Sequence, residues 1–438
     1  MTPTRRRTIP VVLVLASLIL ATPVAAVEPP PDPPATALRV VLDRALGEHA
    51  FLLGEVIRSG IAGAADFNAA AGALEQNSDD VIGAITDVYG AEAGAAFGEQ
   101  WRNHVAYIVD YGRALDRNDP DAAQLAAEQL DRYVTDFSAF LANALPALPP
   151  DAIQGLIGEH VQQLEHVASF DTADFGGAYS AIRETYVHMF AIGDGLTTGI
   201  VTLYPDRFTG RDRAFSPATD LRVTLDRLLG EHSYLAALTM RVVLRGATDV
   251  QSLLDALSAN SEELSALLAD IYGSGASDAF LGLWSSHIDA YVAYVTAVAD
   301  NDDAAATVAL DALRAYQADF STFVANANPF LSAEAVEMLV STHTDQLVAQ
   351  ADAYAAGDYE ASYQLGREAY AHVGELGASL ARAISDQFPL LIPDAAGSQP
   401  RPRVVVVGIV MLGAALILAV RAVGGRSRVR GREELSGG

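Results

Sequence analysis

An internal repeat constrains this chain of 438 residues more than any other feature. Residues 38–49 (LRVVLDRALGEH) recur as residues 221–232 (LRVTLDRLLGEH), an offset of 183 positions. The offset holds without a gap as far as His160 and His343, and one added residue makes it 184 beyond that point. Roughly 40% of the ungapped positions are identical, which indicates duplication of one structural unit.

Hydrophobic periodicity predicts helices in both halves and no strands. Leu42, Leu46, Leu53 and Val56 recur at the three- and four-residue spacing of one helix face, with His49 among them. Long amphipathic helices joined by short loops pack most simply as an antiparallel bundle. We therefore expect an all-α chain with two tandem copies of a four-helix-bundle-like domain. The helices expected in the first copy span residues 37–62, 67–76, 78–89, 91–117, 120–143, 150–170 and 174–203.

Residue types mark the expected ends of these helices. The run 77–80 (NSDD), matched by 260–263 (NSEE), has the composition of an N-terminal cap, so a helix should begin there. Gly90 and Gly273 each follow a tyrosine and predict helix stops. The Asp-Pro pair at 119–120 predicts another start.

Both ends of the chain resemble membrane signals. Residues 1–26 combine three arginines, an apolar stretch and small residues, as secretory signal peptides do. Residues 404–422 hold an apolar run with most of the flanking arginines on its C-terminal side, which predicts one transmembrane helix with a cytoplasmic C-terminus and an extracytoplasmic bulk. The expected order is signal peptide 1–26, Pro-rich spacer 27–36, helical domain 37–208, linker 209–219, helical domain 220–392, Pro/Gly linker 393–403, transmembrane helix 404–422 and basic tail 423–438.

Composition excludes several functions. A formal charge of −27 repels phosphate backbones, so we expect no nucleic-acid partner. The absence of cysteine removes disulfides, thiolate metal sites and cysteine nucleophiles. No P-loop, nucleophile elbow, HExxH or EF-hand sequence is present, and no nucleophile stands out. A binding role is therefore favoured over an enzymatic one.

Histidines are the main candidates for chemistry. Eight of the nine occupy matched positions, and at this background identity four given positions would all be retained by chance about 3% of the time. The four histidines of each half fall on different expected helices, and imidazoles that point inward from several helices of a bundle can share a metal ion. Glu184 and Glu368 stand one helical turn before a histidine and could ligate or orient it. The predicted metal ligands are His49, His104, His160, His188 and Glu184, and His232, His287, His343, His372 and Glu368.

Several functions are compatible with such a site. Imidazole suits copper and zinc, and iron or haem are weaker candidates. Because no CxxCH sequence occurs, any haem would be non-covalent. The first hypothesis is a membrane-anchored, extracytoplasmic metal-binding protein for sequestration, sensing or delivery of copper or zinc. A non-catalytic surface adaptor with core histidines is the second. An oxidoreductase with a metal or haem centre in the bundle is the third.

Five segments shared by the halves carry a resemblance to a known family. They are G-E-H-[AS]-[FY]-L, D-[VI]-Y-G, W-x-x-H, D-F-S-x-F-x-A-N-A and A-[YF]-x-x-x-R-E-x-Y-x-H. They resemble uncharacterised secreted or membrane-anchored bacterial helical-repeat proteins, some of which are labelled copper amine oxidases through a separate domain. The resemblance covers residues 37–390 and implies a helical fold and export. It does not imply amine oxidase activity, because this chain has no β-rich catalytic domain.

Overall fold

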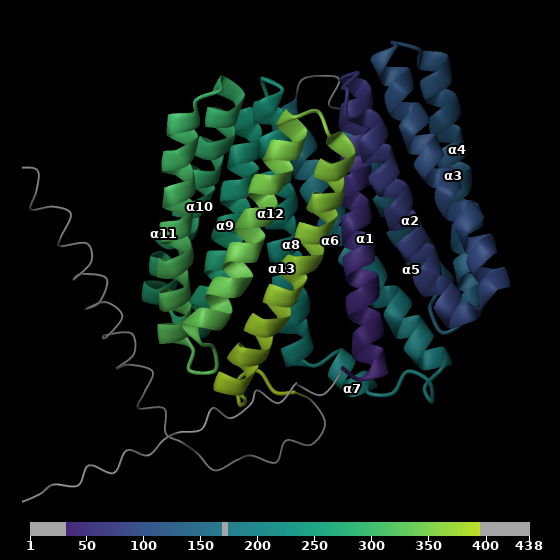
Figure 1. Ribbon diagram of the computed structural model, residues 1–438. Coiled ribbons are helices and arrows are strands. Elements are labelled where there is room, and N and C mark those ends of the chain that lie inside the picture. Colours follow the sequence, from purple (N-terminus) through teal and green to yellow (C-terminus); the bar gives the residue numbers. More distant parts are fainter. Residues whose placement is uncertain (1–31, 169–173, 395–438) are drawn as a thin grey trace, which may run out of the picture. The chain divides into compact units, whose positions relative to one another are not determined.

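Helices form almost everywhere that hydrophobic periodicity predicts them. The computed structural model describes residues 32–168 and 174–394, and within these ranges it contains 13 helices and no strand. The all-α prediction is therefore confirmed for this part of the chain (Figure 1). The helices of the first half are α1 (Pro34–Ile61), α2 (Phe67–Tyr89), α3 (Ala91–Asp116), α4 (Pro120–Ala144), α5 (Pro150–Val167) and α6 (Phe175–Leu203).

The helices of the second half follow the same spacing. After the short α7 (Arg211–Ala214), α8 begins 183 residues beyond the start of α1, and the last helix begins 184 residues beyond the start of α6. These offsets are those of the sequence repeat. The helices are α8 (Pro217–Leu244), α9 (Val250–Tyr272), α10 (Ser274–Asp300), α11 (Asp303–Ala327), α12 (Ala333–Ala355) and α13 (Tyr359–Gln387).

The predicted caps at 77–80 and 260–263 are wrong. Helix α2 runs without interruption through the first of these runs, and α9 runs through the second. The side chain of Asn77 is buried and donates to the carbonyl oxygen of Ala45 and to Glu48, both on α1. Asn77 thus joins α2 to α1 through hydrogen bonds, and no helix begins at this run.

The other predicted helix ends agree with the structure. Helix α2 stops at Tyr89 before Gly90, whose φ of 88° favours glycine. The carboxylate of Asp119 accepts from the backbone N–H of Ala122 and caps α4. Helix α1 begins at Pro34, within the predicted spacer.

The predicted membrane segments lie outside the described residues. This holds for the signal peptide 1–26, for the transmembrane helix 404–422 and for the basic tail. Among the helices that are described, none combines the length and the apolar character needed to cross a bilayer.

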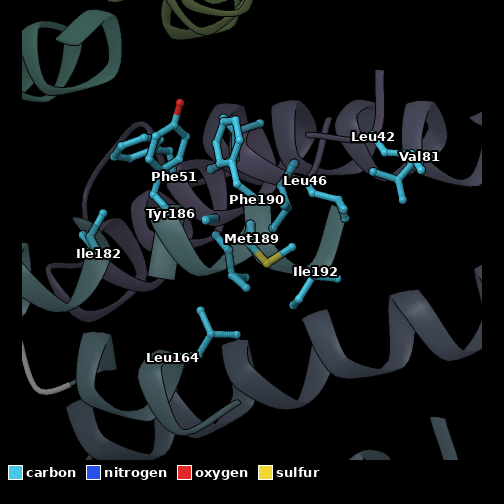
Figure 2. Close-up of a cluster of buried hydrophobic side chains, with 14 of the residues drawn as sticks. Leu42, Leu46, Phe51, Val81, Leu164, Ile182, Tyr186, Met189, Phe190 and Ile192 are labelled. Atoms are coloured by element: carbon cyan, nitrogen blue, oxygen red, sulfur yellow. The ribbon is translucent and has the colours of Figure 1, made fainter. Parts of the chain in front are cut away.

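The two halves contact each other through α1 with α8, α2 with α13, and α6 with α8 and α9. Helix α1 packs along α6 and α8 packs along α13, and these four lie between the pair α3 and α4 and the pair α10 and α11 (Figure 1). Figure 2 shows Phe51 of α1 with Tyr186 and Phe190 of α6 in the apolar core. The ring of Phe51 also stacks on Tyr234 of α8 at 4.9 Å, so the core continues from one half into the other.

The contacts between the halves are reciprocal. Arg367 of α13 donates to Glu48 of α1, and Arg183 of α6 donates to Glu231 of α8. The residues of the second pair are the repeat counterparts of those in the first, with the halves exchanged. Each arginine thus lies in one half of the chain and binds a carboxylate of the other half. The two pairs form an inter-half clasp made of Glu48, Arg367, Glu231 and Arg183.

Candidate metal centre

Three predicted ligands of the first half meet inside the helices. His49 projects from the apolar face of α1, His104 from α3 and His160 from α5. Each ring is buried, and one nitrogen from each lies within 4.8 Å of the others. Nε2 of His49 is 3.2 Å from Nε2 of His104. Two nitrogens bound to one tetrahedral zinc ion at about 2.0–2.1 Å are roughly 3.3 Å apart, so this spacing is that of two ligands.

The second half repeats the triad in its own helices. His232, His287 and His343 extend from α8, α10 and α12, and their donor nitrogens again lie within 4.8 Å of one another. Nε2 of His287 is 3.2 Å from Nε2 of His232. The same geometry thus recurs at matched positions.

The fourth predicted histidine of each half does not join its triad. Nε2 of His188 is hydrogen-bonded at 2.8 Å to the carbonyl oxygen of Leu156 on α5. Nε2 of His372 is bonded at the same distance to the carbonyl oxygen of Leu339 on α12. These rings tie the last helix of each half to its neighbour.

The two predicted carboxylate ligands lie on the surface. Glu184 is exposed and accepts from Ser180, and Glu368 is exposed and accepts from Gln364. Each converging group therefore consists of three imidazoles and no carboxylate.

Aromatic rings enclose the histidines. Trp101 lies 4.5 Å from His49 and 4.8 Å from His104 between ring centroids, and Tyr133 stacks on His104 at 5.0 Å. Tyr133 is not among the residues predicted from the sequence, although its match with Tyr316 in the repeat is a signal for it. These rings exclude water and fix the imidazole orientations. The equivalent contacts in the second half are Trp284 with His232 at 4.7 Å, Trp284 with His287 at 4.6 Å and Tyr316 with His287 at 4.5 Å.

Burial lowers the pKa of all six imidazoles. It lowers the pKa of His104 and His343 to about 4 and that of His287 to about 3. Burial also holds the pKa of the other three rings well below that of an ordinary histidine, and neighbouring imidazoles lower it further. These rings are His49, His160 and His232. All six rings are therefore neutral at pH 7, the protonation state that binds a metal ion.

One ring of each triad has no hydrogen-bonding partner among residues 32–168 and 174–394. Both nitrogens of His160 are buried without one, and so are both nitrogens of His343. A neutral imidazole carries one N–H donor and one acceptor, and leaving such a group unpaired costs about 1–3 kcal/mol. A metal ion would take the acceptor nitrogen, so the residues present fit such an ion.

The inter-half clasp begins next to the first triad. Glu48 precedes His49 in α1, and its carboxylate accepts from Arg367, Asn77 and Tyr234. Glu48 therefore serves the inter-half contact, while its neighbour serves the triad.

Comparison with known proteins gives no relative. No family model, no curated protein and no solved structure matches this chain. The geometry of the histidines is therefore the main indication of function.

Proposed function

We propose that this chain is a metal-binding protein that holds one transition-metal ion in each half. The ligands are His49, His104 and His160 in the first half, with their counterparts in the second. The observation that carries the proposal is the convergence of three buried imidazole nitrogens, twice, at matched positions. Under this proposal the halves are tandem copies of one helical-bundle domain, each with its own site.

The donor set favours copper or zinc. Three neutral imidazoles without thiolate suit zinc, copper, iron or nickel better than magnesium or calcium, which prefer oxygen ligands. Three protein ligands also leave one position of a tetrahedral ion for water or a small exchangeable ligand. Because the rings lie in an enclosed core, the site suits retention of the ion, as in sequestration, sensing or delivery.

Location completes the proposal. The predicted signal peptide and the transmembrane helix at 404–422 would place both sites outside the cytoplasm, next to a membrane. In that setting the protein would meet metal ions as they reach the cell surface.

The test is metal content, with matched variants. The full chain in detergent is stripped with a chelator, exposed to Zn²⁺ or Cu²⁺, passed through gel filtration and analysed for bound metal. We expect two ions per chain, one after His160→Gln or His343→Gln, and none after both. His188→Gln is the control and should retain two, because its ring bonds Leu156.

Two outcomes would refute the metal sites. One is less than one ion per chain in the unmodified protein while circular dichroism reports a helical fold. The other is loss of metal in the His188 variant alone.

A structural role for the triads is the competing function. A separation of 3.2 Å between Nε2 atoms is also that of a hydrogen bond between two neutral imidazoles. In that case the halves would be an adaptor with polar core groups. His104→Gln would then lower stability without changing the metal content.

A further inference from the structure

The second half contains an apolar cavity next to its histidine triad. The cavity has a volume of about 80 Å³, and the surface that faces it is entirely apolar. Trp284 lines it, and the same ring contacts His232 and His287. Other lining residues come from four further helices: Leu229 of α8, Leu264 of α9, Phe320 of α11, and Leu376 and Leu380 of α13.

At two lining positions the second half has a smaller side chain than the first. Val324 and Asn328 line the cavity, whereas the matched positions of the first half hold the larger Leu141 and Leu145. Leu145 is buried, and its Cδ2 lies only 2.9 Å from the place that a Cβ would take on Gly199 of α6. In the first half, Leu145 thus packs against α6, whose counterpart α13 lines the cavity in the second half.

Two lining residues carry polar groups, which are engaged in hydrogen bonds. Asn328 donates to the hydroxyl of Tyr272 at 3.3 Å, and Tyr272 donates to Gln387 at 2.7 Å. Asn328 and Tyr272 both line the cavity, while Gln387 replaces Leu203 of the first half. No cationic side chain lines the cavity, and the chain as a whole carries a charge of −27. This setting disfavours a carboxylate ligand.

We propose that this cavity binds a small neutral apolar molecule, of the size of a benzene ring or a short alkyl chain, and that the first half binds none. An apolar cavity gives water few hydrogen bonds and therefore favours hydrocarbon over solvent. We attribute this difference in ligand binding between the halves to Val324 and Asn328, because the proposed metal ligands are histidines in both halves. The proposal is independent of metal binding.

The two tryptophans, one in each half, allow a direct test. The full chain is labelled with 5-fluorotryptophan and kept in digitonin, a detergent too bulky for the cavity. Fluorine NMR then follows both resonances, assigned with Trp101→Phe, while benzene or 1-butanol is added in the presence of a chelator. We expect a saturable shift of the Trp284 resonance, little change at Trp101, and no response to butyrate.

Variants that exchange the two differing positions provide matched controls. Val324→Leu with Asn328→Leu should weaken binding by about ten-fold or more, because the larger leucine side chains occupy the ligand's space. Val324→Leu alone should also weaken ligand binding, and this variant keeps the Asn328 hydrogen bonds. Leu141→Val with Leu145→Asn should make Trp101 respond.

Three results would overturn the proposal. Equal, non-saturable shifts at both tryptophans would show partitioning into detergent or protein surface. Unchanged binding in Val324→Leu and in the double variant would place the ligand elsewhere. Binding of butyrate as tight as that of 1-butanol would contradict a neutral ligand.

Discussion

The guanidinium of Arg367 donates two hydrogen bonds, each of 3.0 Å, to the carboxylate of Glu48, although 319 residues separate them. Glu48 adjoins His49, and the matched pair Arg183 and Glu231 joins the halves in the opposite sense. Helix α1 therefore carries both a carboxylate of the clasp, Glu48, and a histidine of the first triad, His49. Helix α8 does the same for the second triad with Glu231 and His232. Loss of the clasp should therefore lower the stability of both halves.

Removal of one arginine tests the clasp. Arg367→Ala leaves Glu48 buried without its cation, which should lower the free energy of unfolding by about 2–4 kcal/mol. Arg314→Ala is the control, since Arg314 and its partner Asp311 are 67% and 69% exposed and such pairs contribute about 0–1 kcal/mol. Urea unfolding followed by circular dichroism measures both. Similar losses in the two variants would mean that the clasp contributes no more than a surface pair.

Two glycines set the close approach of the central helices. A Cβ on Gly47 would lie 2.9 Å from atoms of Phe190, Tyr186 and Tyr370, and one on Gly230 would lie 2.5 Å from Tyr370. Gly47→Ala and Gly230→Ala should therefore destabilise by about 1–3 kcal/mol, although alanine favours helix more than glycine does.

Gly72→Ala is the matched control for these two variants. Gly72 also lies inside a helix, α2, but a Cβ there would meet no atom within 4 Å. Its substitution should stabilise by about 0.5–1 kcal/mol through helix propensity alone. Thermal unfolding compares the three variants, and stabilisation by Gly47→Ala would show that the rings move aside at little cost.

Local sequence pattern predicted the helices well and their contacts poorly. Periodicity located α1 and α3 to within a few residues, because the apolar stripe is a property of the segment itself. The run 77–80 resembles a helix cap because Asn and Ser before acidic residues have that composition. Its actual partner, Glu48, is on another helix, and no local pattern could reveal that contact.

The candidate site was predictable in part for the same reason. Repeat matching singled out His49, His104 and His160, which do converge. It could not separate them from His188, because conservation between halves also follows when a ring bonds a backbone carbonyl. The aromatic neighbour Tyr133 carried the same repeat signal and was overlooked because tyrosine is common in cores.

Proton release tests the protonation state of the triads. With folded pKa values near 4 for His104 and His343, the rings bind almost no protons at pH 6.5. Metal binding should then release close to zero protons per site, whereas ligands of ordinary pKa would release about one or more at that pH. Calorimetric titration with Zn²⁺ in two buffers of different ionisation enthalpy measures this number. Release of one proton or more per ion would indicate solvated rings.

The metal-free protein should lose stability as pH falls below the pKa of an unfolded histidine. Burial lowers the pKa of His104 from 6.5 to about 4, so between these values the unfolded chain binds a proton that the folded chain does not. The stability that the neutral His104 ring contributes is thus fully present above pH 6.5 and is lost as pH falls toward 4. His104→Gln removes this one titration, so between about pH 6.5 and 5 its stability curve should be shallower than that of the unmodified protein by about 1 kcal/mol per pH unit. Carboxylates titrate alike in both proteins and cancel in the difference, which urea unfolding in chelator measures. Parallel curves would mean that the imidazole stays solvated when the protein is folded.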